Sequence, residues 1–384
     1  MLLTEEPMFL RYLRRLQKKK EVRSPNGQPF GRRGQAVFIN NTAASYHWGC
    51  YATSMAIYEA LINAGYSVVS FDVETTHLGF GSAPETCTPE VIAAYGEQLA
   101  SVNPMAYRAI SDSDLVVVNG EGTIHRFHQG PRALLSTIKF ATSIGKRVHL
   151  INHSCYPSGG GDPAAPHVEE FYRECLKDAE RLVVRDTVSS LNLDRLGLPH
   201  SVGFDCLPAF VSGLQQIPSM EASIVIGAAS WWEPHRAASF AKNLLEAGID
   251  RNRRIIFLSG GFKRGPEEDP VHFANMKEVI PEMEFINPPS LGEWMGWIKS
   301  AEIVVTGRFH HFIAAAAVSA PIVYSPGNTP KMDAVAEMIG APPCVETTGE
   351  GAHVRLREAI ASPFRTSADQ AQWVRKRALE NLQF

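Results

Sequence analysis

The chain has 384 residues, which is long enough for two domains that each bury a hydrophobic core. Hydrophobic residues make up 45% and charged residues 20% of the sequence, a composition typical of a globular protein. The 37 basic and 40 acidic side chains give a net charge of −3, so no overall basic excess indicates nucleic-acid binding.

The six cysteines are scattered along the chain, and we recognise no CxxC pair or Cys/His ligand spacing among them. This distribution predicts free thiols, with neither a disulfide framework nor a metal site. The N-terminus lacks the apolar core of a signal peptide, and no run of 18 apolar residues occurs. We therefore expect a reducing, cytoplasmic location.

Residues 1–34 form a basic N-terminal segment. Lysines and arginines crowd residues 9–23, interleaved with leucines and a phenylalanine, and the sequence Pro25-Asn26-Gly27 ends this helix-prone stretch. A basic amphipathic helix can bind an anionic membrane surface, which would place the protein at the inner face of the membrane. The alternative is a solvated helix that docks a few leucines on the body of the protein.

Residues 35–212 predict an N-terminal Rossmann-like domain. Short apolar runs alternate with helix-length segments, a pattern typical of a parallel sheet covered on both faces. We expect strands at residues 35–40, 67–71, 115–118, 147–152, 181–184 and 202–203. Helices are expected at residues 50–64, 89–100, 131–144, 166–178 and 187–196.

The same pattern restarts after a linker near residues 211–221, which predicts a second Rossmann-like domain over residues 213–366. Its expected strands are residues 223–227, 254–258, 284–286, 303–305 and 321–324. Its expected helices include residues 237–247, 291–300 and 331–339, and an alanine-rich helix follows residue 309. Residues 367–384 predict a charged C-terminal helix that crosses back over the first domain. The fold class is thus α/β, with two doubly wound domains facing a cleft.

Candidate functional residues lie where these strands end, because ligands bind beyond the carboxyl ends of parallel strands. Arg308 and His310 follow residues 303–305 at the start of a helix. An arginine offers forked donors for phosphate or carboxylate, and a histidine offers a proton that moves near neutral pH. The alternative is a structural ion pair at Arg308 and a helix cap at His310.

Further polar residues follow the strands of the first domain. Glu121 and Asp205 are candidate bases or helix caps, because each stands just beyond an apolar strand. The remaining candidates for substrate binding are Asn41, His47, Asn119, His125, Arg185, Gly260 and Gly261. Neither a GxGxxG fingerprint nor a phosphate-binding GxxxxGK[ST] loop is present, so the glycines do not indicate a nucleotide cofactor.

Taken together, these short motifs resemble the polysaccharide pyruvyl transferase family. They lie, in order, at residues 38–41, 47–50, 114–123, 184–186 and 196–197, at Asp205 and at residues 306–310, followed by Pro321 and Lys331. The resemblance spans about residues 35–340. It departs from the family's commoner pattern at residues 44–49, which replace a Gly-Asn-x-Gly-Asp-like start, and at Asp186, where glutamate is frequent.

The resemblance implies a GT-B-like fold and transfer of an enolpyruvyl unit from phosphoenolpyruvate to a sugar of a polysaccharide or lipid-linked glycan precursor, forming a ketal. It implies that Arg308 clamps the donor anion and that His310 supports the phosphate or gives the proton, with Arg185 as a third donor-site residue. Glu121 or Asp205 is then the acceptor-side base. We expect neither a cofactor nor a metal.

Two other functions remain open at this point. The same architecture suits a glycosyltransferase that uses a nucleotide sugar, with Arg308 and His310 on its phosphates. It also suits a non-catalytic glycan-binding protein that retains the fold.

Overall fold

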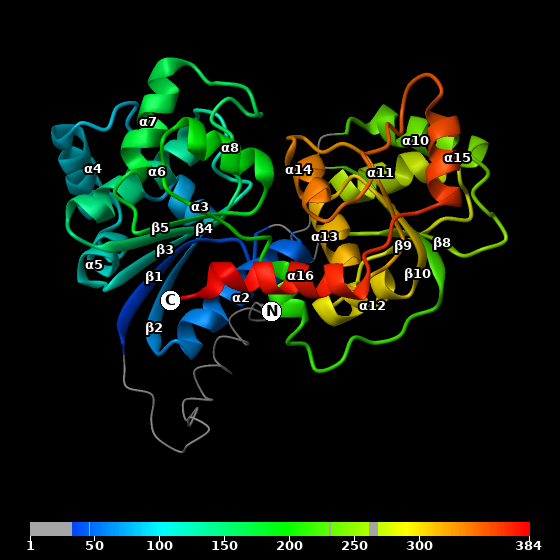
Figure 1. The fold of residues 1–384 in the computed structure, drawn as a ribbon, viewed down its shortest axis with the longest axis horizontal. Coiled ribbons are helices and arrows are strands. Elements are labelled where there is room, and N and C mark those ends of the chain that lie inside the picture. The colour runs from blue at the N-terminus through cyan, green and yellow to red at the C-terminus, as the bar shows by residue number, and fades with distance from the viewer. Residues whose placement is uncertain (1–32, 46, 230–231, 261–267) are drawn as a thin grey trace, which may run out of the picture.

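Figure 1 shows the computed structural model, which describes residues 33–384 except 46, 230–231 and 261–267. The basic stretch at residues 9–23 and Gly261 lie outside the described residues, so the expectations for them stay predictions. Within the described part, no helix combines the length and the apolar character needed to cross a membrane.

The first lobe contains a six-stranded sheet in the order β2-β1-β3-β4-β5-β6, in which every neighbouring pair is parallel. Its strands are β1 (Gly34–Asn41), β2 (Tyr66–Asp72), β3 (Leu115–Glu121), β4 (Arg147–His153), β5 (Arg181–Val184) and β6 (Ser201–Val202). These strands match the apolar runs of the sequence, and β3 is buried along its whole length. Burial on both faces explains why these strands read as continuous apolar runs.

Helices cover both faces of this sheet (Figure 1). They are α2 (Trp48–Asn63), α3 (Val73–His77), α4 (Pro89–Val102), α5 (Pro104–Asp112), α6 (Gln129–Ser143), α7 (Pro166–Leu176), α8 (Thr187–Arg195) and α9 (Leu207–Val211). We did not predict α3, α5 or α9. The start of α5 has a local signal, because Asn103 accepts a hydrogen bond from the Ala106 N–H and Pro104 occupies the first turn.

The second lobe contains a five-stranded parallel sheet in the order β11-β10-β7-β8-β9. Its strands are β7 (Ser223–Gly227), β8 (Ile255–Leu258), β9 (Glu284–Ile286), β10 (Ala301–Thr306) and β11 (Ile322–Tyr324). Its helices are α10 (Pro234–Glu246), α11 (Glu268–Lys277), α12 (Leu291–Lys299), α13 (Phe309–Ala317), α14 (Lys331–Met338) and α15 (Ala352–Ala361). The predicted fold class, two parallel α/β sheets, is therefore confirmed.

Each sheet has one position where the chain reverses its direction of winding. In the first sheet this point lies between β1 and β3, and in the second it lies between β7 and β10. Ligands bind at such points because the loops beyond the two strands separate and leave a crevice. The strand order therefore places a potential binding crevice in each lobe.

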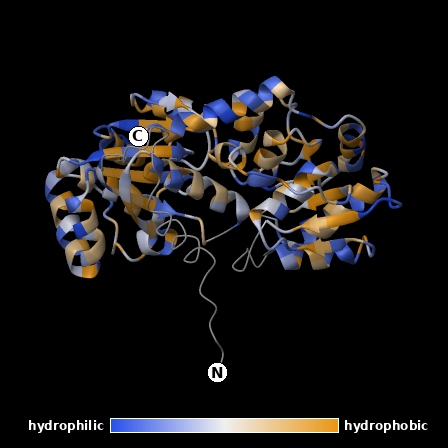
Figure 2. Ribbon diagram, turned by 90° about the horizontal axis from the view of Figure 1, so that it is seen from below, coloured by the Kyte–Doolittle hydropathy of each residue, from blue (hydrophilic) through white to orange (hydrophobic). Residues whose placement is uncertain are grey.

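The two lobes share an apolar core at their junction. Trp48, Phe204 and Leu207, from segments of the first lobe, pack in the same buried cluster as Trp294 and Phe312 of the second. Figure 2 shows the hydrophobic strands lying inside both lobes.

The last helices span both lobes on one side of the molecule (Figure 1). Helix α16 (Ala368–Leu379) contacts α9 and α13, and the short helix η1 (Glu380–Leu382) contacts α2. Asn381 accepts a hydrogen bond from the Asn152 N–H (2.8 Å) and donates one to the Phe204 carbonyl (2.6 Å). The C-terminal segment is thus tied to the ends of the first sheet.

Candidate functional site

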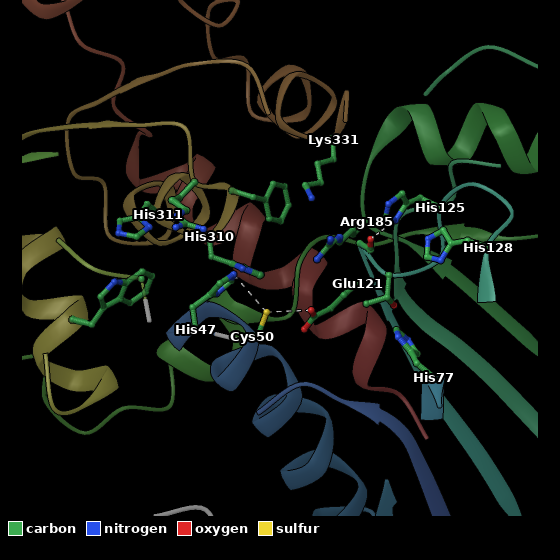
Figure 3. Close-up of a pocket in the computed structure, with 16 residues that line it drawn as sticks. His47, Cys50, His77, Glu121, His125, His128, Arg185, His310, His311 and Lys331 are labelled. Carbon is green, nitrogen blue, oxygen red and sulfur yellow. Dashed lines mark hydrogen bonds between the residues drawn. The ribbon is translucent and has the colours of Figure 1, made fainter. Parts of the chain in front are cut away.

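A cavity of about 350 Å³ lies between the two lobes. Figure 3 shows side chains of both lobes converging on it. The lining residues are His47, Cys50, His77, Glu121, Gly122, Thr123, His125, His128, Arg185, Gly260, Trp294, Arg308, Phe309, His310, His311 and Lys331. Most first-lobe members lie at or beyond the ends of β1, β3 and β5, His77 ends α3, and most second-lobe members follow β8 and β10. The cavity therefore joins the crevices that the two strand orders predict.

Arg308 stands at the N-terminus of α13, directly beyond β10. Its guanidinium forms a buried ion pair with Asp269, so the ion pair named as an alternative in the sequence analysis is present. Its Nε is buried and has no hydrogen-bond partner among the described residues. The side chain is thus held by one carboxylate and keeps a donor for a further acceptor.

Lys331 opens α14 and lines the cavity, and it makes no ion pair with any residue that the structure describes. Its Nζ lies 5.4 Å from the centre of the Phe309 ring, and the Arg185 guanidinium lies 4.7 Å from the same centre. Burial and the charge of Arg185 lower the pKa of Lys331 to about 8. An unpaired cation beside a second cation creates a place where an anion is stabilised.

Arg185, Asp205 and His310 form a buried chain across the junction of the lobes. Arg185 Nη1 donates to Asp205 Oδ2 at 2.7 Å, and His310 Nε2 lies 3.5 Å from the same oxygen. Burial alone raises the pKa of Asp205, but the neighbouring His310 and Arg185 outweigh it and lower the pKa. Asp205 thus remains a carboxylate that orients two cavity side chains, and it does not itself line the cavity.

Glu121 ends β3 with φ at 38°, a left-handed conformation that costs energy for a residue with a side chain. Its carboxylate accepts hydrogen bonds from Thr42 Oγ1 (2.7 Å), Asn119 Nδ2 (3.2 Å) and the Cys50 thiol (3.3 Å). Burial and the charge of Glu121 raise the pKa of the Cys50 thiol. These contacts fix one carboxylate at the cavity wall next to a protonated thiol.

His47 precedes α2 and meets His310 edge to face, with ring centroids 4.8 Å apart. Burial and the charges of His310 and Arg308 lower the pKa of His47 well below its usual value, so its ring is neutral. Gly49 makes the approach possible, because a Cβ there would overlap the His310 side chain. The backbone N–H of Trp48 also donates to the Gly260 carbonyl at 2.9 Å, which ties the start of α2 to the second lobe.

Three further histidines, His77, His125 and His128, line the side of the cavity within the first lobe (Figure 3). His125 Nδ1 lies 2.8 Å from the Gly122 carbonyl, and burial lowers its pKa. His77 and His128 also line a neighbouring cavity of about 490 Å³, together with Ser45 and Glu74. The first lobe thus offers neutral imidazoles and polar groups beside the cationic side of the site.

Most of the predicted site residues come together at this cavity. His47, Glu121, His125, Arg185, Gly260, Arg308 and His310 line it. Asn119 and Asp205 are fully buried behind it and contact lining side chains. Asn41 lies outside the lining, and its side-chain amide donates a hydrogen bond to Ser70 Oγ at 2.8 Å. Phe309 and Lys331 also line the cavity, and neither had a predicted role, although both belong to the motifs that carry the family resemblance.

The structure also brings together three side chains that could ligate a metal. One ligand atom each from His47, Cys50 and His310 lies within 4.8 Å of the others. We had expected no such cluster. The His47-x-x-Cys50 spacing could have indicated part of this cluster, because it puts both side chains at the start of one helix. His310 lies too far along the chain for any spacing to connect it with them.

A comparison with profiles of protein families shows which family the chain belongs to. The sequence profile described as polysaccharide pyruvyl transferase matches residues 8–324. The chain belongs to the polysaccharide pyruvyl transferase family. Among curated proteins, none matches the sequence significantly.

Solved structures similar to this pyruvyl transferase family member share its two-lobed GT-B arrangement. The UDP-GlcNAc 2-epimerase of Methanocaldococcus jannaschii is 12% identical, with a TM-score of 0.53 over 89% of this chain and 97% of that chain. UGT71G1 of Medicago truncatula, solved with UDP-glucose, is 11% identical, with a TM-score of 0.51 over 91% and 96% of the two chains. A putative UDP-N-acetylglucosamine 2-epimerase of Listeria monocytogenes is 9% identical, with a TM-score of 0.54 over 89% and 91%. At these identities the likeness concerns the fold.

Proposed function

We propose that the protein transfers an enolpyruvyl unit from phosphoenolpyruvate to a sugar of a polysaccharide or lipid-linked glycan precursor and closes it to a ketal. The observation that carries the proposal is the cationic wall of the cavity, where Lys331 has no ion-pair partner among the described residues and lies beside Arg185, and where Arg308 also lines the cavity. Phosphoenolpyruvate presents a phosphate and a carboxylate, and both suit such a wall.

In this proposal Arg308 and Lys331 hold the donor anion and Arg185 contributes a third cation. The free Nε of Arg308 and the unpaired Nζ of Lys331 are the donors available to it. Arg185 is fixed by Asp205, so its position does not depend on the ligand. Preorganised charges of this kind stabilise a transition state without having to rearrange during the reaction.

The chemistry begins with a proton added to the methylene carbon of phosphoenolpyruvate, which leaves an oxocarbenium-like centre. One sugar hydroxyl attacks this centre, phosphate departs, and a second hydroxyl closes the ketal. We assign support of the phosphate or delivery of the proton to His310, which lies between Asp205 and His47. Glu121 is the candidate base for the acceptor hydroxyl, because Asp205 lies behind the lining and is engaged by Arg185.

The acceptor fits the first-lobe side of the cavity in this proposal. His125, His77 and His128 lie there, and the adjoining cavity extends the space beyond His77 and His128. Neutral imidazoles and carboxylates suit sugar hydroxyls better than they suit a second anion.

The test is a transfer assay with phosphoenolpyruvate and a glycan fraction from pyruvylated polysaccharide. Phosphate release that depends on the glycan, together with a mass increase of one pyruvyl ketal on the product, supports the proposal. Nucleotide release from a UDP- or GDP-sugar, without reaction of phosphoenolpyruvate, would instead establish a glycosyltransferase.

A further inference from the structure

His47, Cys50 and His310 offer the side chains of a metal site at the junction of the lobes. His47 Nε2 and Cys50 Sγ are 3.8 Å apart, and a ring nitrogen of His310 completes a set whose members lie within 4.8 Å of one another. Ligand atoms around tetrahedral zinc, with bonds of about 2.0 to 2.3 Å, are roughly 3.5 Å apart. The three side chains would therefore have to move by about 1 Å or less for their ligand atoms to reach a common ion.

The local backbone holds these three side chains in place. His47 and Cys50 are separated by three positions at the start of α2, so they point to the same side. His310 lies in the first turn of α13, and only a glycine at position 49 leaves room for its ring against α2. Cys50 and His310 are buried. His310 Nε2 faces Asp205 Oδ2 at 3.5 Å, whereas Nδ1 faces the start of α2, so Nδ1 is the ring nitrogen available to an ion.

Two of the three lysine and arginine side chains that line the cavity are neutralised by carboxylates, and Lys331 is the one without an ion-pair partner in the described part of the chain. Arg185 is matched by Asp205, and Arg308 is matched by Asp269. Glu121 Oε2 lies 3.3 Å from Cys50 Sγ and adds a negative charge next to the thiol. Asp205 also contacts His310 at 3.5 Å, the position of the outer carboxylate that commonly orients a metal-bound imidazole.

We propose that His47, Cys50 and His310 bind a divalent transition metal of the zinc type, with one coordination position left to the cavity. Thiolate and imidazole ligands favour such ions over Mg²⁺ or Ca²⁺, which prefer oxygen. Binding displaces the thiol proton of Cys50 to solvent and leaves a thiolate on the metal. Three protein ligands with one open position are the arrangement of catalytic rather than structural zinc sites, and an anionic oxygen of a substrate can take that position.

This site does not depend on the proposed pyruvyl transfer, but it bears on His310. A ring nitrogen that ligates a metal cannot deliver a proton. In the metal-bound protein, His310 therefore acts on the donor through the ion, and its proton role applies to the metal-free protein.

The experiment is a titration of the full-length, chelator-treated protein with Co²⁺ followed by absorption spectroscopy. We expect saturation at one equivalent, visible bands of a tetrahedral ion and a near-ultraviolet thiolate-to-cobalt band. Zn²⁺ should then displace the Co²⁺. Cys50→Ser should remove the thiolate band, and His47→Gln should weaken binding by at least about tenfold. Cys87→Ser, which removes a free thiol outside the cavity, should leave all bands unchanged.

Circular dichroism and the melting temperature of each metal-free variant establish that it is folded. If Cys50→Ser does not fold, His47→Gln and His310→Asn provide the same comparison through weakened binding. Co²⁺ that fails to bind, or that binds without a thiolate band, would overturn the proposal. Stabilisation of the metal-free protein by phosphoenolpyruvate is measured separately, so the metal site and the pyruvyl donor can fail independently.

Discussion

Lys331 reaches across the cavity to Gly122, which follows β3 in the other lobe. A Cβ placed on Gly122 would lie 3.2 Å from Lys331 Nζ and 3.4 Å from Arg185 Nη2. The backbone of one lobe therefore approaches two cations without a side chain between them. A small anion would occupy the space that a larger residue at this position would fill.

Gly122→Ala should fold but bind phosphoenolpyruvate more weakly, by about tenfold, because its methyl group enters the space beside Lys331 and Arg185. That loss corresponds to about 1.4 kcal/mol. Isothermal titration with phosphoenolpyruvate measures the change. Gly160→Ala is the matched control, because a Cβ there meets nothing within 4 Å and Gly160 lies outside the cavity lining. Equal affinities of both variants and wild type would place the donor elsewhere.

Binding of phosphoenolpyruvate should weaken as the pH rises above about 8. The pKa of Lys331 is lowered to about 8 in the empty site by burial and by Arg185, so the lysine loses its charge above that pH. If this charge holds the anion, the dissociation constant rises by up to about tenfold for each further pH unit. The measurement is a titration series from pH 7 to 9.5. Lys331→Met should bind weakly at every pH, and a wild-type affinity that stays constant across the series would contradict the role of Lys331.

Lys331→Met should also raise the free energy of unfolding at pH 7, on the order of 1 kcal/mol. The folded-state pKa of about 8 lies below the usual lysine pKa of 10.5, so the unfolded chain binds more protons between these two pH values. The buried lysine therefore lowers the free energy of unfolding by its full amount below pH 8, and this penalty disappears as the pH rises from 8 to 10.5. Urea unfolding at pH 7 and pH 10 measures it. The variant's advantage should shrink at pH 10, and an advantage that grows with pH would refute the assignment.

Arg185→Ala should destabilise the fold by about 3 to 5 kcal/mol, because it leaves the buried Asp205 carboxylate without its ion-pair partner. The double variant Arg185→Met with Asp205→Leu should recover most of this loss, since it removes both buried charges. Urea unfolding measures both. A double variant as unstable as Arg185→Ala would show that the pair does not account for the loss.

The sequence predicted the strands of both sheets because parallel strands buried on both faces are continuous apolar runs. It did not predict α3 or α9, which have five residues each and lack a helical period long enough to recognise. The strand orders also had to come from the structure. Apolar runs indicate where strands are, whereas their order depends on which crossovers pack together.

The site was partly predictable for a related reason. Arg308 and His310 follow an apolar strand and Glu121 ends one, so the rule that ligands bind at strand ends was enough to select them. Asp186 shows the limit of the rule, because its carboxylate is used within the first lobe. It accepts hydrogen bonds from the Ser189 N–H (2.7 Å) and Tyr156 Oη (2.8 Å). The contact between Cys50 and Glu121 could not be predicted, because the two residues are far apart in the chain and only the fold brings them together.

The central claim is that the cationic wall holds phosphoenolpyruvate, and a thermal-shift titration tests it most directly. The chain is titrated with phosphoenolpyruvate, UDP, CMP and GDP, in wild type and in Lys331→Met. Lys331 is preferred to Arg308 for this purpose because removing Arg308 would leave the buried Asp269 unpaired and change stability by itself. A ligand that binds only the folded state raises the melting temperature with its concentration. We predict that phosphoenolpyruvate alone stabilises wild type and that the effect is largely lost in Lys331→Met. Stabilisation by a nucleotide, with none by phosphoenolpyruvate, would contradict the account.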